Sequence, residues 1–102
     1  MLIVPLQAIP NQTITTTLAS QVTQLNVYQT YNGLFIDVYL ENTLIIGGVI
    51  CENQNRIVRS AYLGYSGDFA FIDTQGTLDP DYSGLGTRYF LTYLTDEELD
   101  AA

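Results

Sequence analysis

An Asn-Gly pair at residues 32 and 33 separates two β-type segments and constrains the fold more than any other feature of this 102-residue chain. In the segment that follows, the aliphatic side chains alternate with other residues and so share one face: Leu34, Ile36, Val38 and Leu40. Asn-Gly supplies the two positive φ angles that a type I′ turn requires. We therefore predict a β-hairpin of residues 22–31 and 34–40, closed by a type I′ turn, in a sheet with one buried side.

Two more segments near this hairpin have β-type patterns. Aliphatic residues and threonines alternate over residues 13–18, and a tight connection is expected at residues 19–21. A second turn is expected at residues 41–42, before the aliphatic run 43–50. The pair Gly47-Gly48 interrupts that run, which predicts a bulge or the close approach of another backbone.

The aromatic-rich last third of the chain also reads as strand and loop. Strands are predicted at residues 61–65, 68–73 and 88–94, and the last of these is apolar on both faces. Such a strand lies at the centre of a sheet or is covered by a partner. Irregular loops are expected at residues 51–59 and 74–86. The whole pattern predicts an all-β fold, a single small antiparallel β-barrel or sandwich of about seven strands.

The C-terminal end carries the one helical signal. Thr95 and Glu98 have the spacing of a capping box, with Thr95 as the N-cap residue, and we expect a helix of about one turn. The chain length suits one domain. We expect a β-barrel or sandwich domain over residues 1–95, followed by an acidic C-terminal tail over residues 96–102, either solvated or a tag that docks on a basic partner.

The charge of the chain limits its partners. The formal net charge is −8, and the only cations among the side chains are Arg56, Arg59 and Arg88. Binding to nucleic acid or to an anionic membrane requires clustered Lys and Arg, so we expect neither partner. No run approaches the roughly 20 apolar residues of a membrane-spanning helix. The apolar N-terminus is too short for a signal peptide, so we expect synthesis and folding in the cytoplasm.

Candidate catalytic and metal-binding residues are few. The chain has no histidine, and its one cysteine, Cys51, is expected to be a small half-buried side chain. Asp79 and Asp81 flank a proline, and a turn in which they cap backbone N–H groups is favoured over general acid–base work. A calcium site would add Asp73, but the spacing lacks the EF-hand pattern. We therefore expect no enzyme, no cofactor and no metal site.

The tyrosines of the chain could lie in the core or form an interface with another protein. Tyrosine is enriched at protein–protein interfaces, because it combines a large contact area with a polar tip. Arg88, at the entry to the last predicted strand, is expected to form an ion pair or to anchor a backbone carbonyl. The candidate interface residues are Phe35, Tyr39, Tyr62, Tyr65, Tyr82, Arg88, Tyr89 and Tyr93.

Five motifs in order resemble the small phage baseplate plug proteins of the cyanophage type. They are VPLQAIPNQT at 4–13, GLFIDVY at 33–39, YLGY at 62–65, GDFAFID at 67–73 and YSGLGTR at 82–88. The resemblance extends to Leu94. The chain departs from it in three places: Phe35 stands where the family often has tryptophan, residues 49–52 replace a more apolar segment with proline, and the acidic tail is particular to this chain.

The resemblance implies a structural component of a contractile phage tail baseplate, a plug or hub-associated subunit without catalytic role. Its partners would be hub, tube or wedge proteins of the tail, with a homo-oligomer in the symmetric assembly as a further option. The protein would be located in the virion and assembled in the host cytoplasm. The alternative is a generic β-barrel module for a peptide or glycan, with Tyr82, Tyr89 and Tyr93 as its stacking surface. An acid–base hydrolase that uses Asp79 and Asp81 is the least favoured function.

Overall fold

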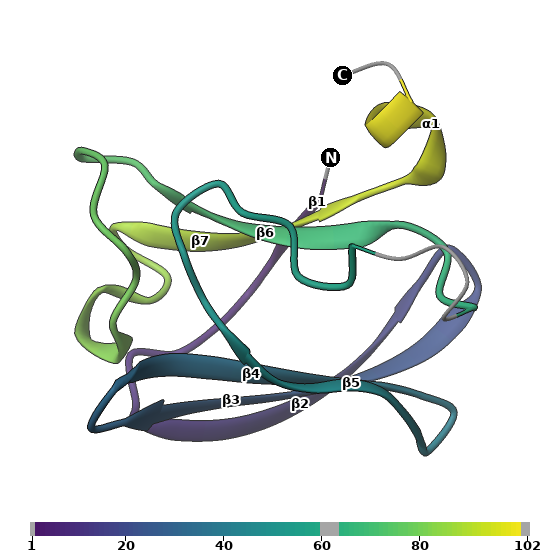
Figure 1. Ribbon diagram of the computed structural model, residues 1–102, viewed down its shortest axis with the longest axis horizontal. Helices are drawn as coiled ribbons and strands as arrows, with labels where there is room; N and C mark the ends of the chain where they lie inside the picture. The colour runs from purple at the N-terminus through teal and green to yellow at the C-terminus, as the bar shows by residue number, and fades with distance from the viewer. Residues whose placement is uncertain (1, 60–63, 101–102) are drawn as a thin grey trace.

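Strands dominate the computed structural model, which describes residues 2–59 and 64–100 of the chain (Figure 1). The strands are β1 (Leu2–Val4), β2 (Asn11–Leu18), β3 (Gln21–Thr30), β4 (Gly33–Leu40), β5 (Thr43–Ile50), β6 (Asp68–Asp73) and β7 (Tyr89–Leu94). A short 3₁₀ helix, η2 (Tyr82–Gly84), and a short α-helix, α1 (Asp96–Asp100), complete the described part.

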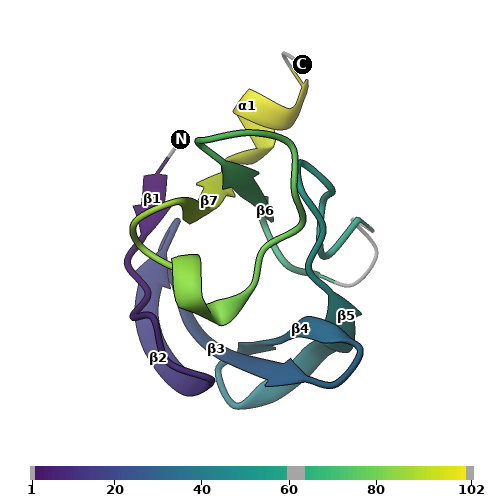
Figure 2. The same cartoon turned by 90° about the vertical axis from the view of Figure 1, so that its left-hand side faces the viewer.

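The strands form two antiparallel sheets. One has the order β1-β7-β6 and the other the order β2-β3-β4-β5. Figures 1 and 2 show the sheets as two layers, and in Figure 2 β1 and β2 lie on the same side of the molecule. Within the described residues neither sheet closes on itself, so of the two predicted architectures, barrel or sandwich, the structure does not show the barrel. It shows a mostly β fold of two antiparallel sheets.

The hydrophobic core consists of side chains from both sheets. β4 buries Leu34, Ile36 and Val38 and turns the intervening residues outward, as its sequence predicts. β7 is the central strand of the three-stranded sheet, which explains why its residues are apolar on both faces. Each fully buried side chain of this size stabilises the folded state by about 1.5–3 kcal/mol relative to an exposed one.

The β3–β4 hairpin is present, but its turn differs from the prediction. Thr30 pairs with Gly33, so Tyr31 and Asn32 form the turn, and of the Asn-Gly pair only Gly33 has a positive φ, of 135°. The Thr30 hydroxyl organises this turn: it accepts from the Asn32 N–H (3.1 Å) and donates to the Gly33 carbonyl (3.1 Å). The type I′ prediction at Asn32-Gly33 is therefore wrong.

The two other hairpins of this sheet carry the φ angles of type I′ turns. Ala19 and Ser20 join β2 to β3 with φ angles of 50° and 63°. Glu41 and Asn42 join β4 to β5 with φ angles of 48° and 68°. Both turns lie where tight connections were predicted, although neither contains glycine. In β5 the register shifts against β4 near Gly47-Gly48, which confirms the predicted bulge.

Two segments of the three-stranded sheet differ from the sequence prediction. β1 was not predicted: a run of three residues before Pro5 has too little pattern, and its partner β7 lies at the other end of the chain. The predicted strand 61–65 lies partly outside the described residues, and Gly64 and Tyr65 are not in a strand. Gly64 has a φ of 84°, which interrupts extended backbone there.

The irregular segment 51–59 is held against β6 by one buried carboxylate. Asp68, at 0% exposure, accepts hydrogen bonds from the N–H groups of Val58 (2.7 Å) and Arg59 (2.8 Å) and from the Arg56 guanidinium (3.0 Å). Isolated bridges join the same segment to Phe71 and Ala70. Segment 51–59 therefore covers the free edge of β6.

Helix α1 begins with the predicted capping box. The Glu98 N–H donates to the Thr95 hydroxyl (3.2 Å), and the Thr95 N–H donates to the Glu98 carboxylate (3.2 Å). Asp96 accepts from the Ser66 hydroxyl and the Gly67 N–H, each at 2.8 Å, and these bonds lower the pKa of Asp96. The start of the acidic tail is thus bonded to the loop before β6. None of the helices in the described ranges is long and apolar enough to cross a membrane.

Candidate protein-interaction surfaces

Apolar side chains gather on the outer face of the four-stranded sheet, over β3, β4 and β5. Strand pairing sets Phe35 between Tyr28 and Ile50, and Tyr39 opposite Leu44. Leu44 is 53% exposed and Ile50 41% exposed. We call these five residues the outer patch: Tyr28, Phe35, Tyr39, Leu44 and Ile50.

The rings of Tyr28 and Phe35 stack within the outer patch, with centroids 6.1 Å apart and planes 15° from parallel. Asp37 lies between the two rows of the patch, and its carboxylate accepts from the Tyr28 hydroxyl (3.1 Å) and the Gly48 N–H (2.7 Å). Burial and this carboxylate raise the pKa of Tyr28, so the hydroxyl stays protonated. Both bonds come from the same sheet and end on Oδ1 of Asp37, so the outer patch carries one carboxylate among its aromatic and aliphatic side chains.

The tyrosines proposed for an interface divide into exposed and buried groups. Phe35 and Tyr39 belong to the outer patch, and Tyr82 is 37% exposed in η2. Tyr65 and Tyr89 are 4% exposed and Tyr93 is 1% exposed, so these three lie in the core. Tyr62 lies outside the described residues. The proposed stacking surface of Tyr82, Tyr89 and Tyr93 is therefore not present as a common exposed face.

The buried tyrosines link the two sheets. Tyr65 stacks on Phe69 at 5.7 Å and meets Tyr93 edge to face at 6.4 Å. The hydroxyls of Tyr65 and Thr23, on β3, are 2.8 Å apart, and burial raises the pKa of Tyr65 to about 12. The Tyr93 hydroxyl donates to the Ser66 carbonyl (2.6 Å). These polar tips are satisfied inside the fold, which is what a core tyrosine requires.

Arg88 forms an ion pair that fixes the loop 74–88. Its guanidinium donates to both carboxylate oxygens of Asp73, each at 2.8 Å, and lies 5.1 Å from the Tyr89 ring centroid. Asp73 also accepts from the N–H groups of Gln75 and Leu78, each at 2.9 Å. The Arg88 hydrogen bonds hold the pKa of Asp73 well below its usual range. Of the two roles predicted for Arg88, the ion pair is confirmed.

The other carboxylates of this loop also bind backbone groups. Asp79 accepts from the Asn53 N–H (3.0 Å), and Asp81 accepts from the Ser83 N–H (2.9 Å) at the start of η2. The predicted capping of a nearby N–H is confirmed for Asp81, whereas Asp79 bonds the distant segment 51–59 instead. No group of three His, Cys, Asp or Glu side chains within residues 2–59 and 64–100 could hold a metal ion. Cys51 is 2% exposed, which makes it more buried than predicted.

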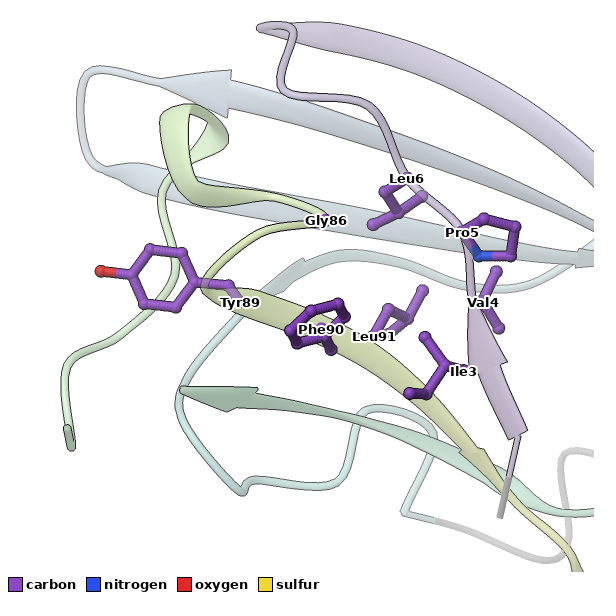
Figure 3. A pocket seen from close by; sticks show the side chains of 8 residues that line it. All are labelled: Ile3, Val4, Pro5, Leu6, Gly86, Tyr89, Phe90 and Leu91. Carbon is purple, nitrogen blue, oxygen red and sulfur yellow. The ribbon is translucent and has the colours of Figure 1, made fainter. Parts of the chain in front are cut away.

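Two hollows flank the N-terminal segment, the first lined mainly by apolar side chains and the second by apolar and polar ones. The first, of about 170 Å³, lies between residues 3–6, Gly86 and residues 89–91 (Figure 3). Gly86 has a φ of 80°, and a Cβ there would come within 2.6 Å of the Leu6 carbonyl oxygen, so the chain requires glycine at this contact. The second, of about 510 Å³, continues along Pro5, Leu6 and Ile9 to residues 12–14 of β2. No charged side chain lines either hollow.

Sequence reasoning missed three members of the outer patch, namely Tyr28, Leu44 and Ile50. Only the register of the paired strands shows that these residues lie beside Phe35 and Tyr39 on the same face. The exposed apolar side chains Leu2 and Ile3 of β1, at 55% and 56%, were missed because β1 itself was not predicted.

Comparison with known proteins identifies one family. No curated protein matches the chain. A family model described as cyanophage baseplate Pam3 plug gp18 matches residues 1–97, which include every strand and the start of α1. That match covers nearly the whole chain and agrees with the resemblance carried by the five sequence motifs. The chain therefore belongs to the family of cyanophage baseplate plug proteins.

Proposed function

We propose that the chain is a structural component of a contractile phage tail baseplate, a plug or hub-associated subunit that acts through protein–protein contacts. Membership of the plug family over residues 1–97 carries the proposal. In this role the protein resides in the virion tail after assembly in the host cytoplasm. Its partners are hub, tube or wedge proteins, and it performs no turnover.

The outer patch is the surface that suits such a partner best. It combines two aromatic rings in a stack with a third, Tyr39, and the exposed aliphatic side chains of Leu44 and Ile50. Aromatic side chains are enriched at interfaces, and the buried centre of an interface is more apolar than its rim. A sheet fixes the backbone that carries these side chains before binding, so little backbone entropy is lost on association.

The loop 74–88 offers a second contact region. The Asp73–Arg88 ion pair and the backbone bonds of Asp79 and Asp81 hold it in one conformation. It presents Leu78, at 57% exposure, and Tyr82 to solvent. A loop fixed in this way can position apolar side chains for a neighbouring tail protein.

Mass spectrometry of purified virions tests the proposal. We expect the protein among the tail components of intact particles and co-purification with hub or tube proteins from disrupted ones. Leu44→Asp should lower its incorporation at least tenfold, because a carboxylate would be desolvated in the contact. Val22→Asp is the matched control, since Val22 is also exposed (47%) on this sheet but lies outside the outer patch.

The comparison of the two variants requires that neither substitution unfolds the protein. Both substituted chains must fold, with urea midpoints close to that of the unchanged protein, because both sites are exposed. A protein that stays free in lysate and is absent from purified tails would contradict the structural role. Equal incorporation of the two variants would remove the outer patch as the contact surface.

A further inference from the structure

β2 forms an edge of the four-stranded sheet that lacks the usual protection against strand pairing. Its eight residues pair with β3 in unbroken register and include no proline and no charged side chain. Natural sheet edges are normally shortened, bulged, charged or covered, because an open edge pairs readily with another strand.

The other sheet edges each have such protection. β5 is bulged at Gly47-Gly48, and β1 has only three residues. β6 is covered by segment 51–59, through bridges and through the bonds to Asp68. Among the described edges, β2 is therefore the one that is long, regular and open.

One hydrogen bond fixes which backbone groups of β2 face outward. The Gln29 N–H donates to the Pro10 carbonyl (2.7 Å), which places Pro10 in the set that bonds to β3. The pattern repeats every second residue in an antiparallel pair, so the even-numbered residues of β2 bond to β3. The N–H and C=O groups of Thr13, Thr15 and Thr17 then point away from the sheet. In the part of the chain that the structure describes, no backbone group of another segment bonds to them.

β2 and its neighbour β3 carry no charged side chain. The first 36 residues contain no Asp, Glu, Lys or Arg, and the first charged side chain, Asp37, lies on β4. With ~4.8 Å between strands, Asp37 is roughly 10 Å from β2. Two hydrogen-bonded links bring acidic segments to the ends of β3 that pair with the ends of β2: Tyr82, the neighbour of Asp81, donates to Gln29, and Asp96 is joined through Ser66 to Gln21.

We infer that the β2 edge pairs with the β2 edge of a second copy of this chain. In an antiparallel pair centred on Thr15, Thr13 faces Thr17 of the second copy, and Thr–Thr pairs across strands are favourable. The two Asp37 carboxylates would stand about 24 Å apart, beyond the ~8–10 Å range of electrostatic repulsion at ordinary salt. A net charge of −8 on each copy therefore opposes this contact little, whereas a basic partner gains nothing from an uncharged edge.

The hollow beside the edge adds apolar area to the same contact. Its apolar lining residues are Pro5, Leu6, Ile9 and Ile14, and its polar ones are Gln7, Gln12 and Thr13. A strand paired with the β2 edge would lie next to it. The contact is isologous, as in most soluble dimers, because the same residues serve on both sides. It joins two four-stranded sheets into one continuous eight-stranded sheet.

Light scattering after size exclusion tests this pairing on the purified full chain over a hundredfold range of concentration. We expect the mass to rise from 11.3 kDa toward twice that value as concentration increases. Thr15→Pro and Thr15→Lys should each weaken the dimer at least tenfold. The first removes an outward N–H that β3 does not use, and the second places a charge on the edge.

Two controls make the result decisive. Thr43→Lys adds the same charge at an exposed position of β5 and should leave the dimer intact, as should Leu44→Asp in the outer patch. A chain that is monomeric at every concentration, or a dimer that survives both Thr15 variants, overturns the inference. A monomer whose Thr15→Lys variant is lost from virions overturns it too, because the edge would then hold a strand of another baseplate protein. None of these results depends on the outer patch, so the dimer contact at β2 and the partner contact at the outer patch are tested independently.

Discussion

At the scale of single residues, two buried carboxylates organise the irregular half of the molecule. Asp68 holds segment 51–59 against β6, and Asp73 holds the loop 74–88. Each carboxylate forms an ion pair with one arginine and also accepts hydrogen bonds from backbone N–H groups. The arginine compensates the negative charge of the carboxylate. These carboxylates thus anchor the two long irregular segments of the chain to the strands beside them.

The Asp73–Arg88 pair makes the stability of the protein sensitive to acid. Because the folded state lowers the pKa of Asp73, its contribution is complete above the unfolded pKa of about 4 and is lost as the pH falls below it. We expect Arg88→Met to lower the free energy of unfolding at pH 7 and to reduce its further decline between pH 5 and pH 2. Urea unfolding across this range measures both effects.

Arg59→Met is the control for that experiment. The Arg59 guanidinium donates to the Arg56 carbonyl (2.6 Å) and does not take part in the Asp73 bonds. We expect the Arg59→Met variant to keep the acid dependence of the unchanged protein. If the Arg88→Met variant also keeps that dependence, the Asp73–Arg88 ion pair is not the source of the acid sensitivity.

At the scale of elements, strand alternation predicted the centre of the four-stranded sheet, because β3 and β4 each bury one face, whereas β5 shows no such alternation. The type of the β3–β4 turn could not be predicted in the same way. The predicted register and the observed one bury the same face of β4, so the hydrophobic pattern does not separate them. The Thr30 hydroxyl bonds and the Tyr28–Phe35 stack accompany the observed register, and both require knowledge of the partner strand.

The β2–β3 turn gives a test of backbone strain. Ala19 and Ser20 both adopt positive φ angles, which cost an L-residue roughly 1–2 kcal/mol and glycine almost nothing. We expect Ser20→Gly to raise the free energy of unfolding by about 0.5–1 kcal/mol, after the larger entropy of glycine in the unfolded chain is subtracted. Urea unfolding at low protein concentration measures the change.

The same substitution in a strand should act in the opposite direction. Thr43, the first residue of β5 after the other type I′ turn, has ordinary extended backbone. Thr43→Gly should lower the free energy of unfolding by about 0.5–1 kcal/mol. A loss of stability in Ser20→Gly would show that the turn is not strained.

At the scale of the whole molecule, the sequence predicted a mostly β protein but not which aromatic residues lie inside it. β7 is apolar on both faces, so its pattern alone cannot distinguish Tyr89 and Tyr93, which are buried, from Phe90, which is half-buried. Their burial depends on the second sheet and on Tyr65, which come from distant parts of the chain. The outer patch could be predicted only in part for the same reason.

Cys51 reports on the integrity of the whole fold. It is the one cysteine of the chain, it is buried, and burial raises the pKa of its thiol. We expect a thiol reagent to label the native protein at least about a thousandfold more slowly than the urea-unfolded chain, since folded domains open globally with such rarity. Labelling should accelerate steeply with urea below the unfolding midpoint. Rapid labelling that urea does not accelerate would show instead that segment 51–59 opens locally.

The pairing of β1 with β7 has a consequence for how the chain folds as it is made. The four-stranded sheet consists of consecutive hairpins, so it can form from the first half of a nascent chain. The three-stranded sheet cannot, because β7 supplies the pairing for both β1 and β6 and leaves the ribosome after the other described strands. The apolar face of the first sheet therefore stays uncovered until translation of the strands is complete. Folding then ends in one late closure between distant segments, and contacts of such long range place the rate in the millisecond-to-second regime of β proteins.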